Sequence, residues 1–432
     1  MRLINTTTLA LEEFLKPPEY AILSHRWEAE EVSYEQYVSQ QPPKSAFRKV
    51  FAACRSPDHR FSKEQMKGAG YRKVAACCAL AKTRGFDWVW IDTCCIDKRS
   101  SAELSEAINS MWTWYANSEE CLVYLSDVEG HSTQHDNASS DKAHERVLEQ
   151  FQASAWFTRG WTLQELLAPM RVTFCDRHWR IFYDLWKSKY FVEVNLWPQK
   201  EYFAAMVAAS GIAVDCLVLN TRITHACVAE RMSWAARRQT TRLEDTAYCL
   251  LGIFDINMPL LYGEGRRAFL CLQEEIIRRS NDESIFAWNF VEDLTPQAIG
   301  ICRVVSTSGL LASDPSYFLY SGDVGIAKHT TRQPYTITNK GLEFEGVASV
   351  ARGDNTSYTR YGFKEVYIVY LNCGYGDQKC AIALGKPVQY NAWRSDDVYA
   401  RYSGGGSQSL IELYPLDVRE DVGVKRFYIQ LT

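Results

Sequence analysis

Four short apolar runs, each ending in polar side chains, stand out in the amino-terminal half of the chain. They are YAILSHRW (Tyr20–Trp27), DWVWID (Asp87–Asp92), ECLVYLSD (Glu120–Asp127) and RVTFCD (Arg171–Asp176). Apolar residues follow one another in these runs without alternating with polar ones, which is typical of strands buried on both faces. The pattern therefore predicts a parallel sheet covered by helices.

Helical patterns separate the four runs. The segment YRKVAACCALAKTRG (Tyr71–Gly85) closes on a glycine suited to a helix C-cap, and RGWTLQELLAP (Arg159–Pro169) is a second helical segment. A third, SAELSEAINSMWTWYANS, has one apolar stripe formed by Leu104, Ile108, Met111 and Tyr115. Strand and helix alternate as in an open α/β unit, with right-handed crossovers. The first crossover, from Glu28 to about Ala69, is long enough for an extra helix around Ser45–Arg55.

The pattern changes twice after this unit. From about Tyr190 to Trp288 it is helical, notably in RLEDTAYCLLGIFD and GEGRRAFLCLQEEIIRRS. After SIFAW, short β-like runs such as QPYTITNKGLEFEGVASV, KEVYIVYLNC and KRFYIQLT lie between turn-rich segments. We therefore expect an α/β domain over residues 1–189, a helical region packed on it over 190–289, and a β-rich carboxy-terminal domain over 290–432.

Composition narrows the class of protein. The chain has 432 residues, of which 47% are hydrophobic and 23% charged, and such a length favours two or three domains. The formal net charge is −4 with both signs interspersed, so nucleic acid is not an expected partner. The sequence contains neither a signal peptide nor an apolar run long enough to span a membrane. This favours a soluble cytoplasmic protein.

The cysteine pattern favours reduced core thiols over a metal site. Fourteen cysteines are present, and those at Cys77, Cys78, Cys94, Cys95 and Cys121 lie inside apolar runs. The chain has no CxxC and no HExxH motif, so no metal is expected. The segment LYGEGRRAF lacks the Lys-Ser/Thr pair of a phosphate-binding loop, and we interpret it as a turn before a helix.

Ligands of an open parallel sheet bind beyond the carboxyl ends of its strands. The polar residues there are Ser24, His25, Arg26 and Trp27 after the first strand, Asp92 to Asp97 after the second, and Ser126 and Asp127 after the third. Individually they have plainer roles: Asp92 and Asp97 could cap helices or turns, Trp27 could be core and Arg26 could form an ion pair. Together they offer a hydroxyl, a titratable ring, a cation and a stacking surface at one edge.

Three segments carry a family resemblance. They are YAILSHRWE, GFDWVWIDTCCIDKRSSAELSEAINSMWTWYANSEECLVYLSDV and AWFTRGWTLQELLAP, which resemble the motif blocks of the fungal heterokaryon-incompatibility (HET) domain between about Leu3 and Asp176. The segments RMSWAARRQTTRLEDTAYCLLGIFDINMPLLYGEG and ITNKGLEF are similar to stretches that follow this domain in such proteins. The resemblance implies a role in programmed cell death when genetically unlike hyphae fuse.

A more distant resemblance concerns mechanism. HET domains are similar to Toll/interleukin-receptor (TIR) domains, and RGWTLQEL resembles the SRWCLNEL type of motif in plant TIR domains, with Thr162 in place of its Cys. This implies a TIR-like α/β fold and places Glu165 on the glutamate with which TIR-type enzymes cleave nicotinamide adenine dinucleotide (NAD). It implies an NAD glycohydrolase with NAD as substrate, no separate cofactor, and a homo-oligomer when active. Glu165 would be catalytic, and Ser24, His25, Arg26, Trp27, Asp92, Asp97 and Trp161 would bind substrate, with Trp27 or Trp161 as the platform for nicotinamide.

Alternative interpretations remain open from the sequence. The run Thr162 to Glu165 fits an S/T-x-x-E capping box, which alone would explain Glu165. Cys94 or Cys95 with His25 could form a nucleophilic pair. The domain could also be a non-enzymatic adaptor that signals by self-association, set off by a protein partner. We interpret the β-rich region as regulatory, because it follows the other two as a compositionally distinct unit.

Overall fold

The computed structural model describes two compact units, Met1–Thr221 and Arg222–Thr432. The residues it describes are 1–40, 68–130, 140–187, 200–288, 307–326, 334–350, 363–375, 378–387, 398–402, 414–415 and 423–429. The helix expected around Ser45–Arg55 lies outside them. The division into units falls within the helical region expected over residues 190–289, and the three-part arrangement stays a prediction.

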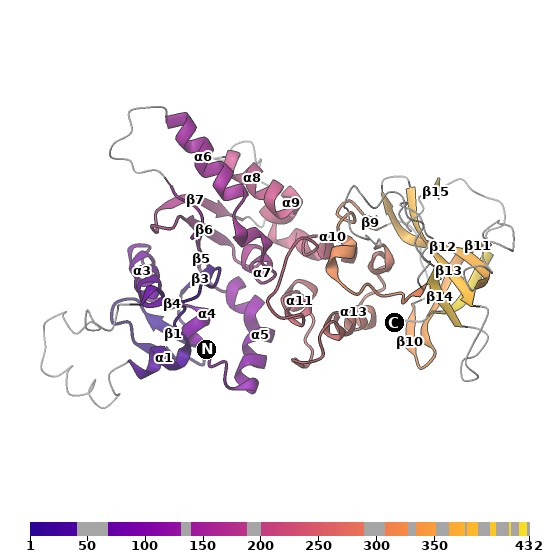
Figure 1. Ribbon diagram of the computed structural model, residues 1–432, viewed down its shortest axis with the longest axis horizontal. Coiled ribbons are helices and arrows are strands. Elements are labelled where there is room, and N and C mark those ends of the chain that lie inside the picture. The colour runs from indigo at the N-terminus through magenta and orange to yellow at the C-terminus, as the bar shows by residue number, and fades with distance from the viewer. Residues whose placement is uncertain are drawn as a thin grey trace, which may run out of the picture. The chain divides into compact units, whose positions relative to one another are not determined.

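The first unit contains a seven-stranded sheet in the order β2-β1-β4-β3-β5-β6-β7 (Figure 1). Its strands are β1 (Arg2–Asn5), β2 (Leu11–Glu13), β3 (Ala21–His25), β4 (Trp88–Trp90), β5 (Glu120–Tyr124), β6 (Arg171–Cys175) and β7 (Ile181–Trp186). The central strands β4, β3, β5 and β6 are parallel, as the four apolar runs predict. The outer strands β1, β2 and β7 pair antiparallel and were not expected from the sequence. The mixed α/β fold class is confirmed.

Helices cover both faces of this sheet. They are α1 (Tyr34–Ser39), α3 (Ala69–Thr83), α4 (Asp92–Cys95), α5 (Ser101–Ala116), α6 (Ser140–Gln152), the 3-10 turn η1 (Ala155–Thr158), α7 (Thr162–Leu167), α8 (Lys200–Ser210) and α9 (Val214–Val218). Figure 1 shows α3 on one side of the central strands and α5 and α7 on the other. The sheet is therefore sandwiched between two helical layers, and its central strands are shielded from solvent.

Local sequence explains where these helices begin and end. Ser100 precedes α5, and its hydroxyl accepts a hydrogen bond from the Glu103 amide, as an N-cap does. Helix α3 ends just before Gly85, whose φ of +92° places it in the left-handed region that favours glycine. Of the apolar stripe predicted in α5, Ile108, Met111 and Tyr115 are buried.

The second unit begins with short helices. They are α10 (Val228–Ser233), α11 (Asp245–Tyr248), α12 (Leu251–Phe254), α13 (Arg267–Arg279) and the 3-10 turns η4 (Glu283–Phe286) and η5 (Pro315–Phe318), with η3 (Asn220–His225) crossing the boundary between units. The buried face of α13 carries Ala268, Phe269, Leu272, Ile276 and Ile277. That spacing fits the helical period on which its prediction rested.

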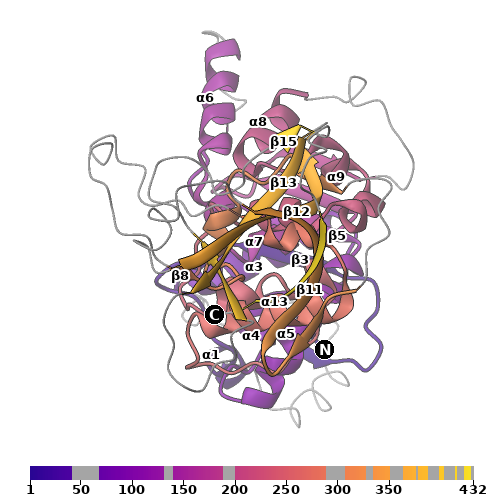
Figure 2. The same cartoon turned by 90° about the vertical axis from the view of Figure 1, so that its right-hand side faces the viewer.

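A second sheet follows and is mainly antiparallel. Its strands are β8 (Thr307–Ser308), β9 (Gly325–Ile326), β10 (Thr336–Thr338), β11 (Gly341–Val350), β12 (Phe363–Tyr375), β13 (Gln378–Pro387), β14 (Val398–Tyr402), β15 (Tyr414–Pro415) and β16 (Gly423–Ile429). The order is β10-β11-β16-β14-β13-β12-β9, and β11 also pairs with β12, so five strands close into a ring. Figure 2 shows β11, β12 and β13 of this sheet. The β-rich composition after residue 290 is thus confirmed as a sheet.

The described helices are all too short or too polar to cross a membrane.

Candidate functional site

The carboxyl end of β3 presents two polar side chains to opposite faces of the sheet. Every residue of Ala21–His25 is buried, because β3 lies between its parallel neighbours β4 and β5. Successive side chains of a strand point to opposite faces. Accordingly, Ser24 contacts Glu165 of α7, whereas His25 contacts Lys73 of α3. The end of one strand thereby positions a hydroxyl in one layer and an imidazole in the other.

Ser24 and Glu165 form a buried hydrogen bond, and a third residue, Trp156, bonds to the same hydroxyl. The Trp156 Nε1–H group donates to Ser24 Oγ over 2.8 Å. Indole nitrogen can only donate, so the Ser24 hydroxyl accepts from Trp156, and it can donate its own hydrogen to Glu165 Oε2 when that group is a carboxylate. Trp156, Ser24 and Glu165 are thus linked by two hydrogen bonds in series, and one oxygen of the Glu165 carboxyl group has the Ser24 hydroxyl as its partner.

The Glu165 carboxyl group is largely removed from water. The residue is 9% exposed, and burial raises its pKa to about 8, against opposing effects of the Ser24 hydrogen bond and the Arg159 charge. The buried Tyr115 hydroxyl lies close by and donates to the Leu23 carbonyl over 3.0 Å. Glu165 is thus mainly protonated at neutral pH in the free protein, whereas the sequence interpretation requires it to be ionised. A shifted carboxyl group of this kind is common at functional sites.

The capping box considered for Thr162 and Glu165 is wrong. Helix α7 begins at Thr162 with Trp161 in the N-cap position, and no side chain caps it. The Thr162 hydroxyl instead lies 2.6 and 2.9 Å from the carbonyl oxygens of Trp156 and Arg159, which share its one hydrogen. The Glu165 carboxylate bonds to Ser24 of β3 rather than to the backbone of its own helix. Helix capping therefore does not explain a glutamate at this position.

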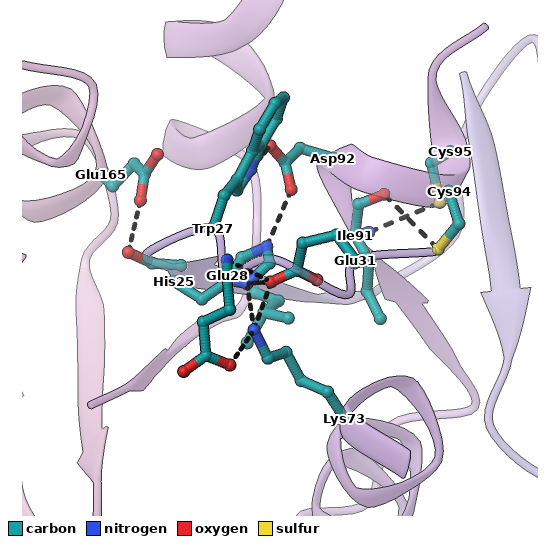
Figure 3. Close-up of polar contacts among 12 residues, drawn as sticks. His25, Trp27, Glu28, Glu31, Lys73, Ile91, Asp92, Cys94, Cys95 and Glu165 are labelled. Atoms are coloured by element: carbon teal, nitrogen blue, oxygen red, sulfur yellow. Dashed lines mark hydrogen bonds and ion pairs between the residues drawn. The ribbon is translucent and has the colours of Figure 1, made fainter. Parts of the chain in front are cut away.

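His25, Asp92 and Trp27 form a second polar group at the same sheet edge (Figure 3). Asp92 begins α4, and its Oδ1 lies 3.0 Å from His25 Nε2 while its Oδ2 accepts from Trp27 Nε1 over 2.7 Å. Burial opposes ionisation of Asp92, but the hydrogen bond and charge of His25 and the charge of Lys98 hold its pKa well below the usual range. Asp92 is therefore an anion that fixes the Trp27 ring.

Lys73 closes the other side of His25. Its Nζ lies 3.3 Å from His25 Nδ1 and 3.0 Å from the Glu28 carboxylate, and it also pairs with Glu31. In Figure 3 Lys73 approaches His25 from below, whereas Asp92 and Trp27 lie above. The His25 ring is thus held on both sides, with Nε2 facing the Asp92 carboxylate and Nδ1 facing Lys73 at 3.3 Å and the Glu31 carboxylate at 3.6 Å.

The remaining predicted site residues lie around these groups in different ways. Arg26 is exposed, and Trp161 is half-buried at the start of α7. The Asp97 carboxylate accepts hydrogen bonds from its own loop, from Arg99 Nε and Nη2 over 2.9 Å each. The structure thus brings Ser24, His25, Trp27, Asp92 and Glu165 to one edge. Which of the eight touch a ligand stays a prediction.

Cys94 and Cys95 are poorly placed for the nucleophilic alternative. Both are buried in α4, where Cys94 Sγ donates to the Ile91 carbonyl and Cys95 Sγ accepts from the Ile91 amide. Burial raises the pKa of Cys94 well above its usual value, which disfavours the thiolate. Within the described ranges, no group of three or more His, Cys, Asp and Glu side chains is placed to hold a metal ion.

Sequence reasoning missed three residues that shape this edge: Trp156, Lys73 and Lys98. Trp156 lies inside the quoted segment AWFTRGW, but its contact with Ser24 joins residues far apart in the chain. In the sequence, Lys73 looks like any lysine on the surface of a helix. It is buried because α3 packs beside β3. These roles follow from tertiary neighbours, for which a single sequence gives no signal.

Comparison with known proteins identifies a known domain in part of the chain. Residues 20–165 match the family model of the heterokaryon incompatibility protein (HET). This chain contains a HET domain. The match begins at Tyr20, just before β3, and ends at Glu165, so the HET domain includes both the Ser24 and the Glu165 side of the site.

A curated relative supports the assignment. The chain is 38% identical over 264 residues to vegetative incompatibility protein HET-E-1 of Podospora anserina. That alignment takes in 60% of this chain but only 16% of the relative's length. Beyond the HET domain, residues 267–341 match a domain of unknown function, DUF8212. No solved structure matches the chain.

Proposed function

We propose that this HET-domain protein acts in heterokaryon incompatibility as an effector of programmed cell death, and that it does so by cleaving the nicotinamide–ribose bond of NAD. The HET match and the name of the Podospora relative support the cellular role. One observation supports the chemical part: the Glu165 carboxyl group lies at the carboxyl end of the parallel strands, where such sheets bind ligands, and it bonds to Ser24 and does not cap its helix.

The chemistry needs few groups. Nicotinamide leaves as a neutral molecule from a positively charged ring, so the bond breaks without a general acid. The ribose then becomes oxocarbenium-like, and an ionised Glu165 would stabilise that charge by on the order of 3 kcal/mol. Water adds to the same carbon and loses a proton, and the products are nicotinamide, ADP-ribose and a proton. NAD is thus a substrate, and the reaction needs no cofactor.

The protonation state of Glu165 suits a site that is switched on by its substrate. In the free protein, burial favours the neutral acid at neutral pH. A cationic nicotinamide ring beside the carboxyl group would favour the carboxylate, because an adjacent opposite charge lowers the pKa of an acid. The Ser24 hydroxyl lies within hydrogen-bond distance of Oε2 and would donate to the charged form when it arises, which would stabilise it.

The proposal also assigns a TIR-like character to the HET domain. RGWTLQEL would correspond to the TIR motif that holds the catalytic glutamate, with Trp27 as the aromatic platform and Asp92 attracting the cationic ring. Trp27 is 43% exposed, so one part of its ring is accessible. Arg26, His25, Asp97 and Trp161 complete the proposed set, and a homo-oligomer would be the active form, as the TIR resemblance implies.

A non-enzymatic adaptor is the second candidate. The observation that favours it is the length of the Podospora relative, of which the matched part is a small fraction. A module joined to other domains can transmit a signal from a protein partner by self-association alone.

One experiment separates the two functions. Purified protein is incubated with NAD while nicotinamide release and assembly state are followed together. Release that grows more steeply than linearly with protein concentration supports an oligomeric enzyme. Assembly with NAD left intact supports the adaptor and overturns the enzymatic proposal.

A further inference from the structure

Lys98 occupies one face of the Trp27 ring. Its Nζ lies 3.4 Å from the centre of that ring, the closest cation–π geometry among the described residues. The negative face of an indole attracts cations, and Trp is the strongest of the aromatic side chains in this respect. The contact therefore shows that this face of Trp27 accepts a positive charge.

The ring and its covering cation differ in how firmly they are held. Trp27 is anchored through its Nε1–H group, which donates to Asp92 Oδ2 over 2.7 Å, and Asp92 is in turn held by His25 at 3.0 Å. Lys98 is an exposed residue on a long flexible stem in the turn between α4 and α5. Departure of Lys98 would therefore leave the Trp27 ring bonded to Asp92, and Asp92 bonded to His25.

A flat organic cation would use this arrangement better than an ammonium group does. Its ring would cover more of the indole surface than a single Nζ, and stacking adds to the attraction between cation and ring. Asp92 beside the ring supplies the opposite charge. The ligand class that matches both features is a planar aromatic cation such as an N-alkylpyridinium.

We infer that Trp27 and Asp92 form a subsite for a planar organic cation, which Lys98 occupies in the free protein and must leave when the ligand binds. The choice of ligand rests on the proposed function, because the nicotinamide ring of NAD is such a cation. The inference adds that Lys98 competes with the substrate and so weakens its binding.

The test measures binding without any cleavage. The probe is 1-methylnicotinamide, which has the charged ring but no ribose bond to break, and its dissociation constant is measured by calorimetry on the full chain. Lys98→Met keeps the stem and removes the competing charge, so it should tighten binding by roughly two- to thirtyfold, the range of a single cation–π contact. Lys82→Met is the matched control, since Lys82 pairs with Asp87 on the surface; it should leave the constant unchanged.

Two more measurements identify the surface that binds. Trp27→Leu should remove most of the affinity for the probe. Adding Lys98→Met to Trp27→Leu should not increase that affinity, because the indole face for which Lys98 and the probe compete is absent. Neutral nicotinamide should respond little to Lys98→Met.

The inference is overturned if Lys98→Met binds the probe no more tightly than wild type, if the gain persists without Trp27, or if neither protein binds the probe. Tightening by Lys98→Met in a protein that leaves NAD intact upholds the cation subsite and overturns the proposed NAD cleavage alone.

Discussion

Ser24 and Glu165 lie 141 residues apart in the chain, and the Ser24 hydroxyl forms a buried hydrogen bond with the Glu165 carboxyl group. The bond joins the end of β3 to helix α7, and Trp156 donates to the same hydroxyl. Glu165 is therefore positioned by the sheet rather than by the capping of its own helix. This relationship leads to predictions about pH, stability and substrate binding.

Removal of the Ser24 hydroxyl should shift the titration of Glu165. The hydrogen bond stabilises the carboxylate and lowers the Glu165 pKa, so Ser24→Ala should move that pKa further above 8. It also leaves the buried Trp156 N–H without its acceptor, at a cost of about 1–3 kcal/mol. The shift can be read from the pH profile of kcat/KM for nicotinamide release.

Ser118→Ala is the control for that variant. Ser118 is also buried, and its hydroxyl donates to the Tyr115 carbonyl over 2.8 Å. Its loss should lower stability without moving the pH profile. Equal profiles for Ser24→Ala and wild type would contradict the positioning role of Ser24.

The wild-type protein should release nicotinamide faster at alkaline pH. Burial raises the pKa of Glu165 to about 8 in the free protein, and the reaction needs the carboxylate. We therefore expect kcat/KM to rise with pH through a midpoint near 8, measured from pH 6 to 9. A rate that falls over this range would indicate that the protonated acid is the active form.

The stability of the fold should change with pH in the opposite direction to the rate, falling as the pH rises. The folded Glu165 binds a proton up to about pH 8, whereas the unfolded residue releases it near its ordinary value of 4.5. The contribution of Glu165 to the free energy of unfolding is therefore fully present below pH 4.5 and is lost as the pH rises towards 8. The total loss is on the order of a few kcal/mol.

Glu165→Gln isolates this contribution. Glutamine keeps an acceptor oxygen for Ser24 and does not titrate. Unfolding by denaturant, followed from pH 5 to 9, should show the variant gaining stability over wild type as the pH rises. A difference that is constant with pH would mean that Glu165 is not buried as a neutral acid.

Much of the sheet could be predicted from the sequence. The buried strands β3, β4, β5 and β6 are continuous apolar runs, and such runs report burial on both faces directly. The outer strands were missed because β1 and β2 are short, with three or four residues each, and their pairing depends on a neighbouring strand. The end of α3 near Gly85 was predicted correctly, because a glycine at a helix C-terminus is a local signal.

The site was only partly predictable, because several of its contacts join residues that lie far apart in the chain. Placing Ser24, His25 and Asp92 at one edge needed just the topology of parallel strands. The capping alternative for Glu165 failed because a local motif gives way when a tertiary partner, here Ser24, satisfies the carboxyl group. The opposing orientations of Ser24 and His25 follow from strand geometry, but their partners on α7 and α3 do not.

Asp92 should act mainly on substrate binding. Its carboxylate fixes the Trp27 ring and supplies a negative charge beside it. Asp92→Asn keeps one acceptor oxygen but loses the charge, so KM for NAD should rise roughly tenfold, with a smaller effect on kcat. Steady-state kinetics checks this split. A fall in kcat at unchanged KM would place Asp92 in the chemical step instead.

The most direct test of the central claim is nicotinamide release from NAD by purified wild-type protein and by Glu165→Gln. Both are assayed at the same concentration and at a pH where their thermal unfolding shows both to be folded. The account predicts release by wild type and a loss of about a hundredfold or more in the variant. Equal release by the two proteins would contradict it, as would a wild-type protein that leaves NAD intact under conditions in which it assembles.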